Sequence, residues 1–368
     1  MRTDTPHSVL DQAGRRHPAP DGIPFLRAGR EDMAAEALAL LDSGDRDAAL
    51  VLLLADQDDW WRGPRADAAA LRELVRDAHR LTLRDAMQRL AWGPVGLYFA
   101  HRWSDPTFLA GLALVEAHWD APRSAFELAC GIGHHLRELA RRDVEVAGAD
   151  VVFAKLWLAR HWVCPEARLL CLDAAQDWPA LGSFDLVTCH DAFYFLEPKA
   201  VILARLRGLV APGRGVLAIS HVHNRDWGNL SAGAAVTAAE MAALLPDAVL
   251  YDDAELTRAL AESRAPRAAT ADALHGVEAF CAVEGPGLRL PRAVDGVLAL
   301  PPEGAELRRN PLYDSGGAIA WPSDRYEREY GPRATYPAHS AAPDRAVLDA
   351  ETAEAARRRE LLDLPERW

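Results

Sequence analysis

The sequence is poor in cysteine and lacks long apolar runs. Its 368 residues include 5 cysteines, an odd number, and no two of them form a Cys-x-x-Cys pair. This usage favours reduced, buried thiols in a reducing compartment and predicts a cytoplasmic protein. The first residues have no apolar signal-peptide core, and no window has the uninterrupted apolar length of a membrane span. We therefore expect neither secretion nor membrane insertion.

The sequence also lacks an excess of positive charge. It holds 41 lysine and arginine residues against 54 aspartate and glutamate residues, and its formal net charge is −13. Proteins bind phosphate backbones through surplus lysine and arginine, so this balance disfavours nucleic acid as a general partner. It favours a small, neutral or cationic ligand. Because 50% of the residues are hydrophobic, the chain has enough apolar surface for one large decorated domain or for two.

Residues 1–104 predict a helical N-terminal cap region. Residues 1–25 are rich in proline, glycine and charge, and we expect them to be loose. Apolar residues recur at helical spacing over 31–54, with a break at Ser43-Gly44, and again over 66–91. Aromatic residues gather at Trp60-Trp61 and over 98–103, where Tyr98 and His101 are candidate lid residues above a ligand.

Residues 105–285 predict the main domain, because short apolar runs alternate there with helical segments. The predicted strands are 124–130, 144–149, 167–172, 184–189, 216–220, 249–251 and 277–283. Helices are expected at 134–142, 151–162, 198–210, from Thr237 onward and at 255–262. This order predicts a mostly parallel sheet that is covered on both faces. Residues 286–368 predict an irregular extension, rich in proline and glycine, that ends in a charged helix at 346–362.

The most informative segment runs from Glu127 to His134 and reads Glu-Leu-Ala-Cys-Gly-Ile-Gly-His. A strand leads into Gly131 and Gly133, which allow a close backbone approach and a sharp turn into a helix. Asp150 follows the second strand, seventeen residues after Gly133, and Asp173 follows the third. The carboxyl ends of parallel strands meet at one sheet edge, so this pattern predicts a site for a nucleotide-type cofactor.

Two details favour a sulfonium cofactor over a dinucleotide. The position at which a dinucleotide site would carry its third glycine is Leu136. Glu127 would repel a pyrophosphate, but it would attract the α-ammonium group of S-adenosylmethionine.

This set of residues resembles the class I S-adenosylmethionine-dependent methyltransferases over about half of the chain, roughly residues 124–285. The resemblance implies an α/β fold with a Rossmann-like, mostly parallel seven-stranded sheet. It assigns Asp150 to the ribose hydroxyls and Asp173 to the adenine edge, and it leaves His134 as a departure at the third position of the glycine triplet. The implied cofactor-binding residues are Glu127, Ala129, Cys130, Gly131, Gly133, Asp150, Val151, Asp173, Ala174 and His190.

Catalytic candidates follow the fourth and fifth strands of this sheet, where cofactor and acceptor meet in the family. Methyl transfer needs a positioned nucleophile and, where a proton must leave, a base. We expect His190 and His221 as candidate bases and Asp191 as their orienting partner. Acceptor-pocket residues are predicted at Phe193, Tyr194 and His223. Each of these side chains has a competing interpretation as a polar loop residue that satisfies local backbone groups.

Two further motifs carry less weight. His221 and His223 have the spacing of a metal pair, with Asp191 as the only candidate third ligand, and we expect no resident metal. Asn310-Pro-Leu-Tyr313 resembles the Asn-Pro-Pro-Tyr signature of amino-group methyltransferases, but it lies after the last predicted strand and reads better as a turn.

The sequence therefore predicts a cytoplasmic S-adenosylmethionine-dependent methyltransferase that acts on a small-molecule oxygen or nitrogen nucleophile. A homodimer is compatible with the aromatic segments of the extension. Three alternatives stay open: an NAD-dependent oxidoreductase on the same kind of sheet, a non-catalytic cofactor-binding partner protein, and a methyltransferase acting on a protein or RNA.

Overall fold

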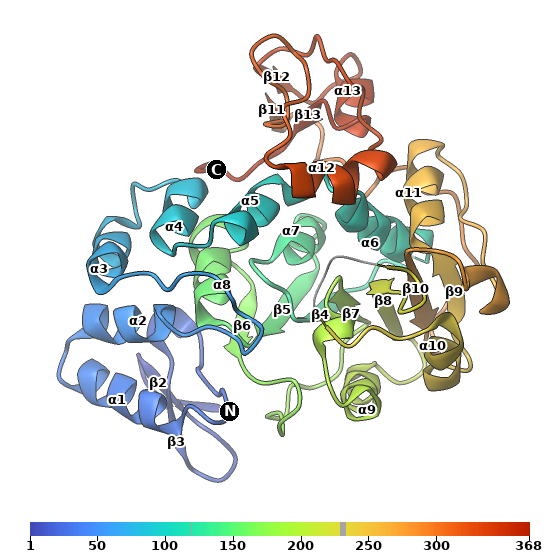
Figure 1. Ribbon diagram of the computed structural model, residues 1–368. Coiled ribbons are helices and arrows are strands. Elements are labelled where there is room, and N and C mark those ends of the chain that lie inside the picture. Colours follow the sequence, from blue (N-terminus) through green and yellow to red (C-terminus); the bar gives the residue numbers. More distant parts are fainter. Residues whose placement is uncertain (119, 229–232) are drawn as a thin grey trace.

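A seven-stranded sheet forms the centre of the computed structural model, which describes residues 1–118, 120–228 and 233–368 (Figure 1). The strands are β4 (Ser124–Leu128), β5 (Glu145–Asp150), β6 (Arg168–Cys171), β7 (Leu186–His190), β8 (Val216–His223), β9 (Val249–Asp252) and β10 (Ala279–Glu284). Their order is β6-β5-β4-β7-β8-β10-β9, and β10 runs antiparallel to both of its neighbours. The predicted Rossmann-like, mostly parallel sheet is confirmed.

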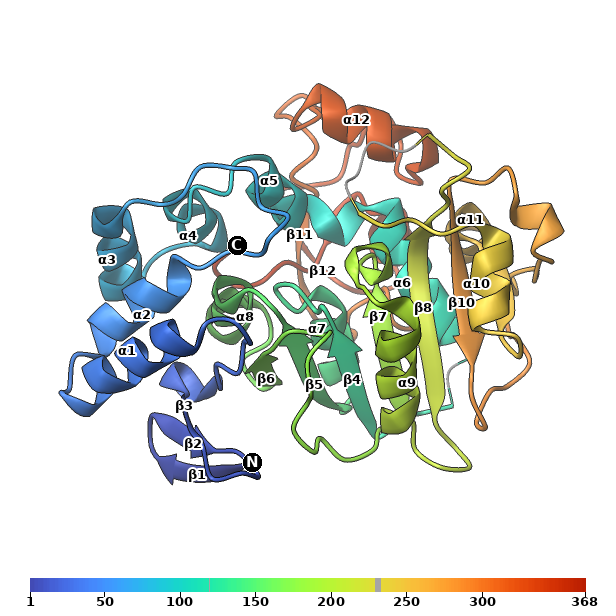
Figure 2. The ribbon, with the colours of Figure 1, turned by 60° about the horizontal axis from the view of Figure 1, so that its bottom comes forward.

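Helices cover both faces of this sheet, so central strands such as β7 are buried along their whole length. One face carries α6 (Pro106–Ala117), α7 (His134–Ala140), α8 (Phe153–Leu158) and α11 (Asp253–Ala261). The other face carries α9 (Lys199–Leu209) and α10 (Ala238–Leu244), which lie in front of the strands in Figure 2. The strand order reverses between β4 and β7, and ligands of open α/β sheets bind beyond the carboxyl ends of the strands at such a point.

The N-terminal region begins with a small sheet, so the expectation that residues 1–25 are loose is wrong. Strands β1 (Arg2–Thr5), β2 (Ser8–Leu10) and β3 (Arg16–Pro18) pair antiparallel. Their side chains are mostly polar, and ion pairs from Arg16 to Asp4 and Asp42 join them to the first helix. Strands this short and polar have no apolar alternation that a sequence pattern could reveal.

Five helices follow: α1 (Glu31–Asp42), α2 (Arg46–Leu54), α3 (Ala68–Asp77), α4 (Leu83–Arg89) and α5 (Pro94–His101). The predicted break at Ser43-Gly44 is confirmed. The segment 66–91 forms two helices, because Thr82 and Asp85 build a capping box that starts α4. Backbone hydrogen bonds from Leu26 to Cys171 and from Cys171 to Pro24 cover the exposed edge of β6.

The C-terminal extension contains strands β11 (Glu306–Arg309), β12 (Arg345–Val347) and β13 (Leu361–Leu362), with helices α12 (Asp324–Tyr330) and α13 (Ala353–Arg357). The predicted terminal helix at 346–362 is wrong, since only 353–357 is helical there. Leu307, Leu348 and Leu361 share a small core that requires strands on both sides of α13. The chain ends against the N-terminal region, where the indole of Trp368 donates to the Ala100 carbonyl. None of the described helices has the length and apolarity needed to cross a membrane.

Candidate active site

The loop after β4 turns through three left-handed residues. Ala129 has φ 56°, Gly131 has φ 56° and Gly133 has φ 85°. The third residue of the loop with a positive φ is therefore Ala129. His134, the third position of the predicted triplet, is instead the first residue of α7. The thiol of Cys130 packs under Gly148 of β5, which leaves only the Cys130 backbone to line the loop. A left-handed alanine is unfavourable, so the surrounding structure must hold it in place.

Asp150, the predicted ribose acid, is buried and already accepts hydrogen bonds. Its carboxylate accepts from the Gly131 N–H at 3.0 Å and from the Val152 N–H at 2.9 Å. The ammonium group of Lys155 lies 3.4 Å from the same carboxylate and 3.9 Å from Asp58. Asp150 thus joins the glycine loop to the start of α8 and to the aromatic loop of the N-terminal region.

The other predicted residues of the adenine end lie half-buried at the same sheet edge. Val151, Asp173 and Ala174 follow β5 and β6, which pair through Asp150 and Cys171. Asp173 accepts from the Ala175 N–H at 2.8 Å in a local turn. This arrangement leaves the assignment of these residues as a prediction.

A buried polar cluster lies beneath helix α6. Glu127 and His135 approach to 3.5 Å, and the rings of His135 and His190 stack at 3.9 Å. His190 shares a hydrogen bond of 2.7 Å with Ser220, directly under Gly111. Burial raises the pKa of Glu127 to about 7, and it lowers the pKa of His190 well below 6.5. This burial argues against His190 as the base that receives a proton from an acceptor.

Asp191 is held by donors from three elements. It accepts from Tyr98 at 2.8 Å, from Arg102 at 2.9 Å and from Tyr194 at 3.1 Å. Burial alone would raise the pKa of this carboxyl, but His221 and Arg102 lower it. The residue is left-handed, with φ 51°. Asp191 is therefore an ionised centre between the N-terminal region and the sheet.

His221 points to the same place because β8 is bulged. The register between β10 and β8 shifts at this point, and His221 has φ 50°. Its Nδ1 lies 3.0 Å from a carboxylate oxygen of Asp253, and its Nε2 lies 3.9 Å from Asp191. Burial would lower the pKa of His221, but Asp253 and Asp191 outweigh burial and raise it. His221 is the candidate base that sits between two carboxylates.

The predicted acceptor residues separate into two groups. The ring of Tyr194 stacks on His223 at 4.0 Å, close to His221. Phe193 is completely buried against α9, with the Lys199 ammonium over its ring, so it does not line an acceptor pocket. His101 packs against Trp368 and Tyr326, away from Asp191. Of the two candidate lid residues, only Tyr98 contacts the site.

Sequence reasoning missed several residues of this site: Arg102, His135, Lys155, Asp253 and Arg333. Arg102, Asp253 and Arg333 come from elements outside the motif pattern, and Arg333 lies in the C-terminal extension. His135 and Lys155 lie in α7 and α8, the helices that follow the glycine loop and Asp150. Asp253 was detectable as an acid at the start of α11, but nothing in the sequence pairs it with a histidine on β8.

Two groups among the described residues have metal-ligand composition. They are Glu127, His135 and His190, and Asp191, His221 and His223, with ligand atoms within 4.8 Å of one another in each group. Asp191 is already paired with Arg102, which disfavours a dication in the second group. In the first group the two imidazoles stack face to face, whereas ring nitrogens bind metals in the ring plane.

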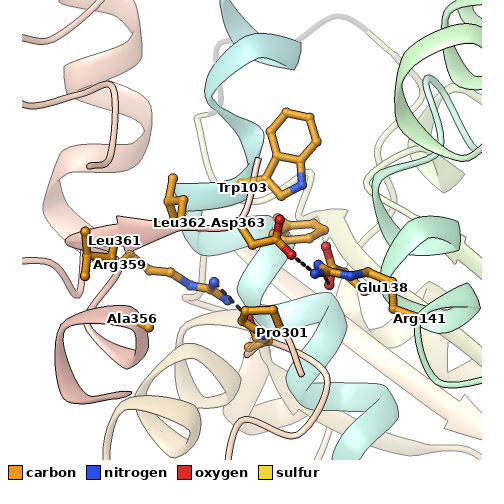
Figure 3. Close-up of a pocket in the computed structure, with 11 residues that line it drawn as sticks. Trp103, Glu138, Arg141, Pro301, Ala356, Arg359, Leu361, Leu362 and Asp363 are labelled. Carbon is orange, nitrogen blue, oxygen red and sulfur yellow. Dashed lines mark hydrogen bonds and ion pairs between the residues drawn. The ribbon is translucent and has the colours of Figure 1, made fainter. Parts of the chain in front are cut away.

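Two cavities among the described residues lie away from this site. One is enclosed between α7 and the C-terminal extension, where Arg141 pairs with Asp363 and Arg359 donates to the Ala299 carbonyl (Figure 3). The other lies at 309–315 in the extension. The ledge formed by the glycine loop and Asp150 is instead covered, because a Cβ atom on Gly131 would lie 3.2 Å from the ring of Phe99.

Comparisons with known proteins converge on one kind of domain. Residues 125–213 match a family model described as a methyltransferase domain. A trans-aconitate 2-methyltransferase of Methylobacterium radiotolerans is 38% identical over 107 residues, which are 28% of this chain and 40% of that protein. The chain thus spans less than half the length of this curated relative.

Two solved structures are also similar to parts of this chain. An amino pentose methyltransferase from Micromonospora echinaspora is 30% identical over 33% of this chain and 52% of its own, with a TM-score of 0.28. A plantazolicin methyltransferase is 13% identical over 57% of this chain and 97% of its own, with a TM-score of 0.38. The family match spans β4, β5, β6 and β7 of the sheet.

Proposed function

We propose that this protein is a class I S-adenosylmethionine-dependent methyltransferase, because residues 125–213 match a family model described as a methyltransferase domain. One observation carries the proposal. The left-handed glycine loop, Asp150 and Asp191 follow three neighbouring strands and meet at the edge where the strand order reverses. Backbone N–H groups and carboxylates at that edge are what a cationic nucleoside requires.

The polar groups of the site fit this cofactor. The Oε2 atom of Glu127 is buried and has no hydrogen-bond partner among the described residues, so it can accept from an ammonium group. The Oδ2 atom of Asp150 accepts only from Gly131 and retains a lone pair for a ribose hydroxyl, whereas Oδ1 already faces the Val152 N–H and the Lys155 ammonium group. The space fits only after a movement, because Phe99 covers Gly131. When bound, the cofactor supplies an electrophilic methyl group, and the residues of the chain orient the acceptor and receive its proton.

We assign the chemistry to residues around Asp191. His221 is proposed as the base, since its Nε2 faces Asp191 and its raised pKa suits proton uptake near neutral pH. Tyr194 and His223 are proposed to contact the acceptor. We propose that the cofactor is held by the glycine loop together with Asp150, Val151, Asp173 and Ala174. His190, with a ring nitrogen within 4.8 Å of a Glu127 carboxylate oxygen, is proposed to keep that carboxylate in position.

A small-molecule acceptor with an oxygen or nitrogen nucleophile is the proposed substrate class. The name of the curated relative supports it, since that protein is a trans-aconitate 2-methyltransferase. We also propose a cytoplasmic location, which the five unpaired, buried cysteines support. The proposed organisation is an N-terminal cap region (1–104), the methyltransferase domain (105–285) and the extension (286–368).

A second candidate is a cofactor-binding protein without catalysis. It is favoured by the cover that Phe99 forms over the loop and by the saturation of Asp191 with donors of the chain itself. Turnover separates the two candidates, because only an enzyme consumes the cofactor.

Calorimetric titration with S-adenosylhomocysteine and with NAD tests the proposed cofactor. We expect one S-adenosylhomocysteine per chain and no binding of NAD, and the reverse result would assign an oxidoreductase. Incubation with trideuteromethyl-labelled S-adenosylmethionine and a panel of carboxylic acids, phenols and amines, followed by mass spectrometry, then tests turnover. Labelled product would exclude the non-catalytic candidate.

A further inference from the structure

The C-terminal extension reaches the candidate base through two charged residues. Arg333 lies in a short helical turn, Gly331–Arg333, directly after α12. Its guanidinium pairs with a carboxylate oxygen of Asp253, and that same oxygen lies 3.0 Å from Nδ1 of His221. Three residues from the extension, from α11 and from β8 are therefore joined through a single oxygen atom.

We propose that Asp253 and Arg333 are positioning residues that fix the tautomer and the protonation of His221, so that the C-terminal extension completes the catalytic centre. This inference rests on the proposed function, in which His221 is the base. Asp253 accepts the Nδ1–H of His221 and thereby places the free Nε2 toward Asp191 and the acceptor. The proton that leaves the acceptor's O–H or N–H then forms the Nε2–H bond.

Burial makes this arrangement specific. The side chains of His221, Asp253 and Arg333 expose only 4%, 1% and 13% of their surface, so the ion pairs are little screened by water. The second oxygen of Asp253 accepts from the Cys281 thiol at 3.2 Å, which fixes the plane of the carboxylate. Arg333 also lies 3.4 Å from Glu278, which anchors its far side. An Asp253 carboxylate without Arg333 would be a buried charge with one partner fewer.

The charged and titratable groups around His221 come from every neighbouring element. They are Asp191 after β7, His223 on β8, Asp253 on α11, Cys281 on β10, Arg333 of the extension, and Arg102 and Tyr98 behind Asp191. Asp253 and Asp191 favour the protonated imidazole, and Arg333 opposes it. Substitution of Asp253, Asp191 or Arg333 should therefore shift the pKa of His221 in a direction that is known in advance.

Nitrogen-15 NMR of the full chain labelled at histidine tests the inference without any acceptor. A His221→Gln variant assigns the resonances. In the unsubstituted protein we expect the Nδ1–H tautomer and a titration above the ordinary histidine range. In Asp253→Asn we expect the pKa of His221 to fall by about one unit or more, which is the range for removal of an adjacent opposite charge. In Arg333→Gln we expect it to rise, and Arg333→Lys should restore it in part.

A matched control lies in the same extension. Arg325 is in α12 and pairs with Glu329, so Arg325→Gln should leave His221 unchanged. Because Asp253→Asn could fail to fold, Arg333→Gln alone is decisive: an unchanged His221 titration in a variant with an unaltered melting temperature overturns the inference.

Titration of the same samples with S-adenosylhomocysteine separates two kinds of failure. If the unsubstituted chain does not bind it, the proposed function fails while the coupling of His221 to Arg333 stands. If all variants bind it and the tautomer and pKa of His221 do not respond, only this inference fails.

Discussion

The ring of Phe99, on helix α5, lies against Gly131 of the glycine loop. A Cβ atom placed on Gly131 would be 3.2 Å from Cε1 and 3.5 Å from Cζ of that ring. Phe99 also packs on Tyr98 and on His134, so the N-terminal region and the loop form one surface. The Phe99 ring covers Gly131 in this arrangement, so this ring must move before a ligand can lie against that part of the loop.

Replacement of Phe99 by alanine should open the ledge. Because a ligand binds more weakly when only part of the population is competent, Phe99→Ala should tighten the binding of S-adenosylhomocysteine. The same change removes a buried aromatic ring and should cost about 3–5 kcal/mol of stability. Calorimetry and urea denaturation measure the two effects. Phe108→Ala is the matched control, because it removes a buried ring that faces His135 and should lower stability without a gain in affinity.

A methyl group on Gly131 tests the same contact from the other side. Gly131→Ala adds a contact with Phe99 and a left-handed alanine, for which the backbone cost alone is about 1–2 kcal/mol. Gly14 has φ 78° and open space around it, so Gly14→Ala measures the backbone cost by itself. In a double-mutant cycle of unfolding free energies, Gly131→Ala should couple to Phe99→Ala, whereas Gly14→Ala should not. Additive values at both positions would place Phe99 away from the loop.

The buried carboxyl group of Asp105 should make the free energy of unfolding depend on pH. Burial raises its pKa to about 8, while Arg102 and the Tyr326 hydroxyl partly oppose the rise. The folded chain therefore binds this proton more tightly than the unfolded chain, whose carboxyl titrates near 3.8. The stabilisation is complete below that value and is lost as the pH rises toward 8, by at most about 1.4 kcal/mol per pH unit.

Urea denaturation between pH 5 and pH 8 measures this effect. Asp105→Asn should remove the Asp105 contribution, so that the difference between the two proteins changes steadily across the window. Tyr326→Phe is the control: it deletes the hydroxyl that donates to Asp105 and keeps the titrating group. A pH-independent difference would mean that Asp105 is ionised in the folded state.

Much of the sheet follows from the sequence because its strands are buried on both faces. Runs such as Leu186–His190 and Val216–His223 are apolar enough to be recognised, and the motif order gives their arrangement. Short polar strands carry no such pattern, so β1 to β3 were missed. At the C-terminus, a charged segment with helical composition becomes partly strand because Leu307 and Leu361 need a common core.

The sequence pattern placed several of the candidate residues near one another where they lie close to strand ends. Glu127, Asp150, Asp191 and His221 lie in or just after the carboxyl-terminal parts of four strands, and the structure brings them to one edge of the sheet. The bulge that turns His221 toward Asp253 depends on pairing with β10, and the partner Arg333 lies 112 positions further along the chain. Contacts between residues so far apart in the sequence depend on how the elements pack together. They cannot be predicted by assigning strands and helices one at a time.

The most direct test of the account is calorimetric titration of S-adenosylhomocysteine into the unsubstituted chain and into Asp150→Asn. The account predicts binding of one ligand per chain and a loss of about 1–3 kcal/mol in the variant, because buried donors are left unpaired when the carboxylate is replaced. Asp143→Asn, an exposed left-handed aspartate just before β5, should bind as tightly as the unsubstituted chain. Equal affinity in all three proteins, or no binding to any of them, would contradict a cofactor lying across the carboxyl ends of β4 and β5.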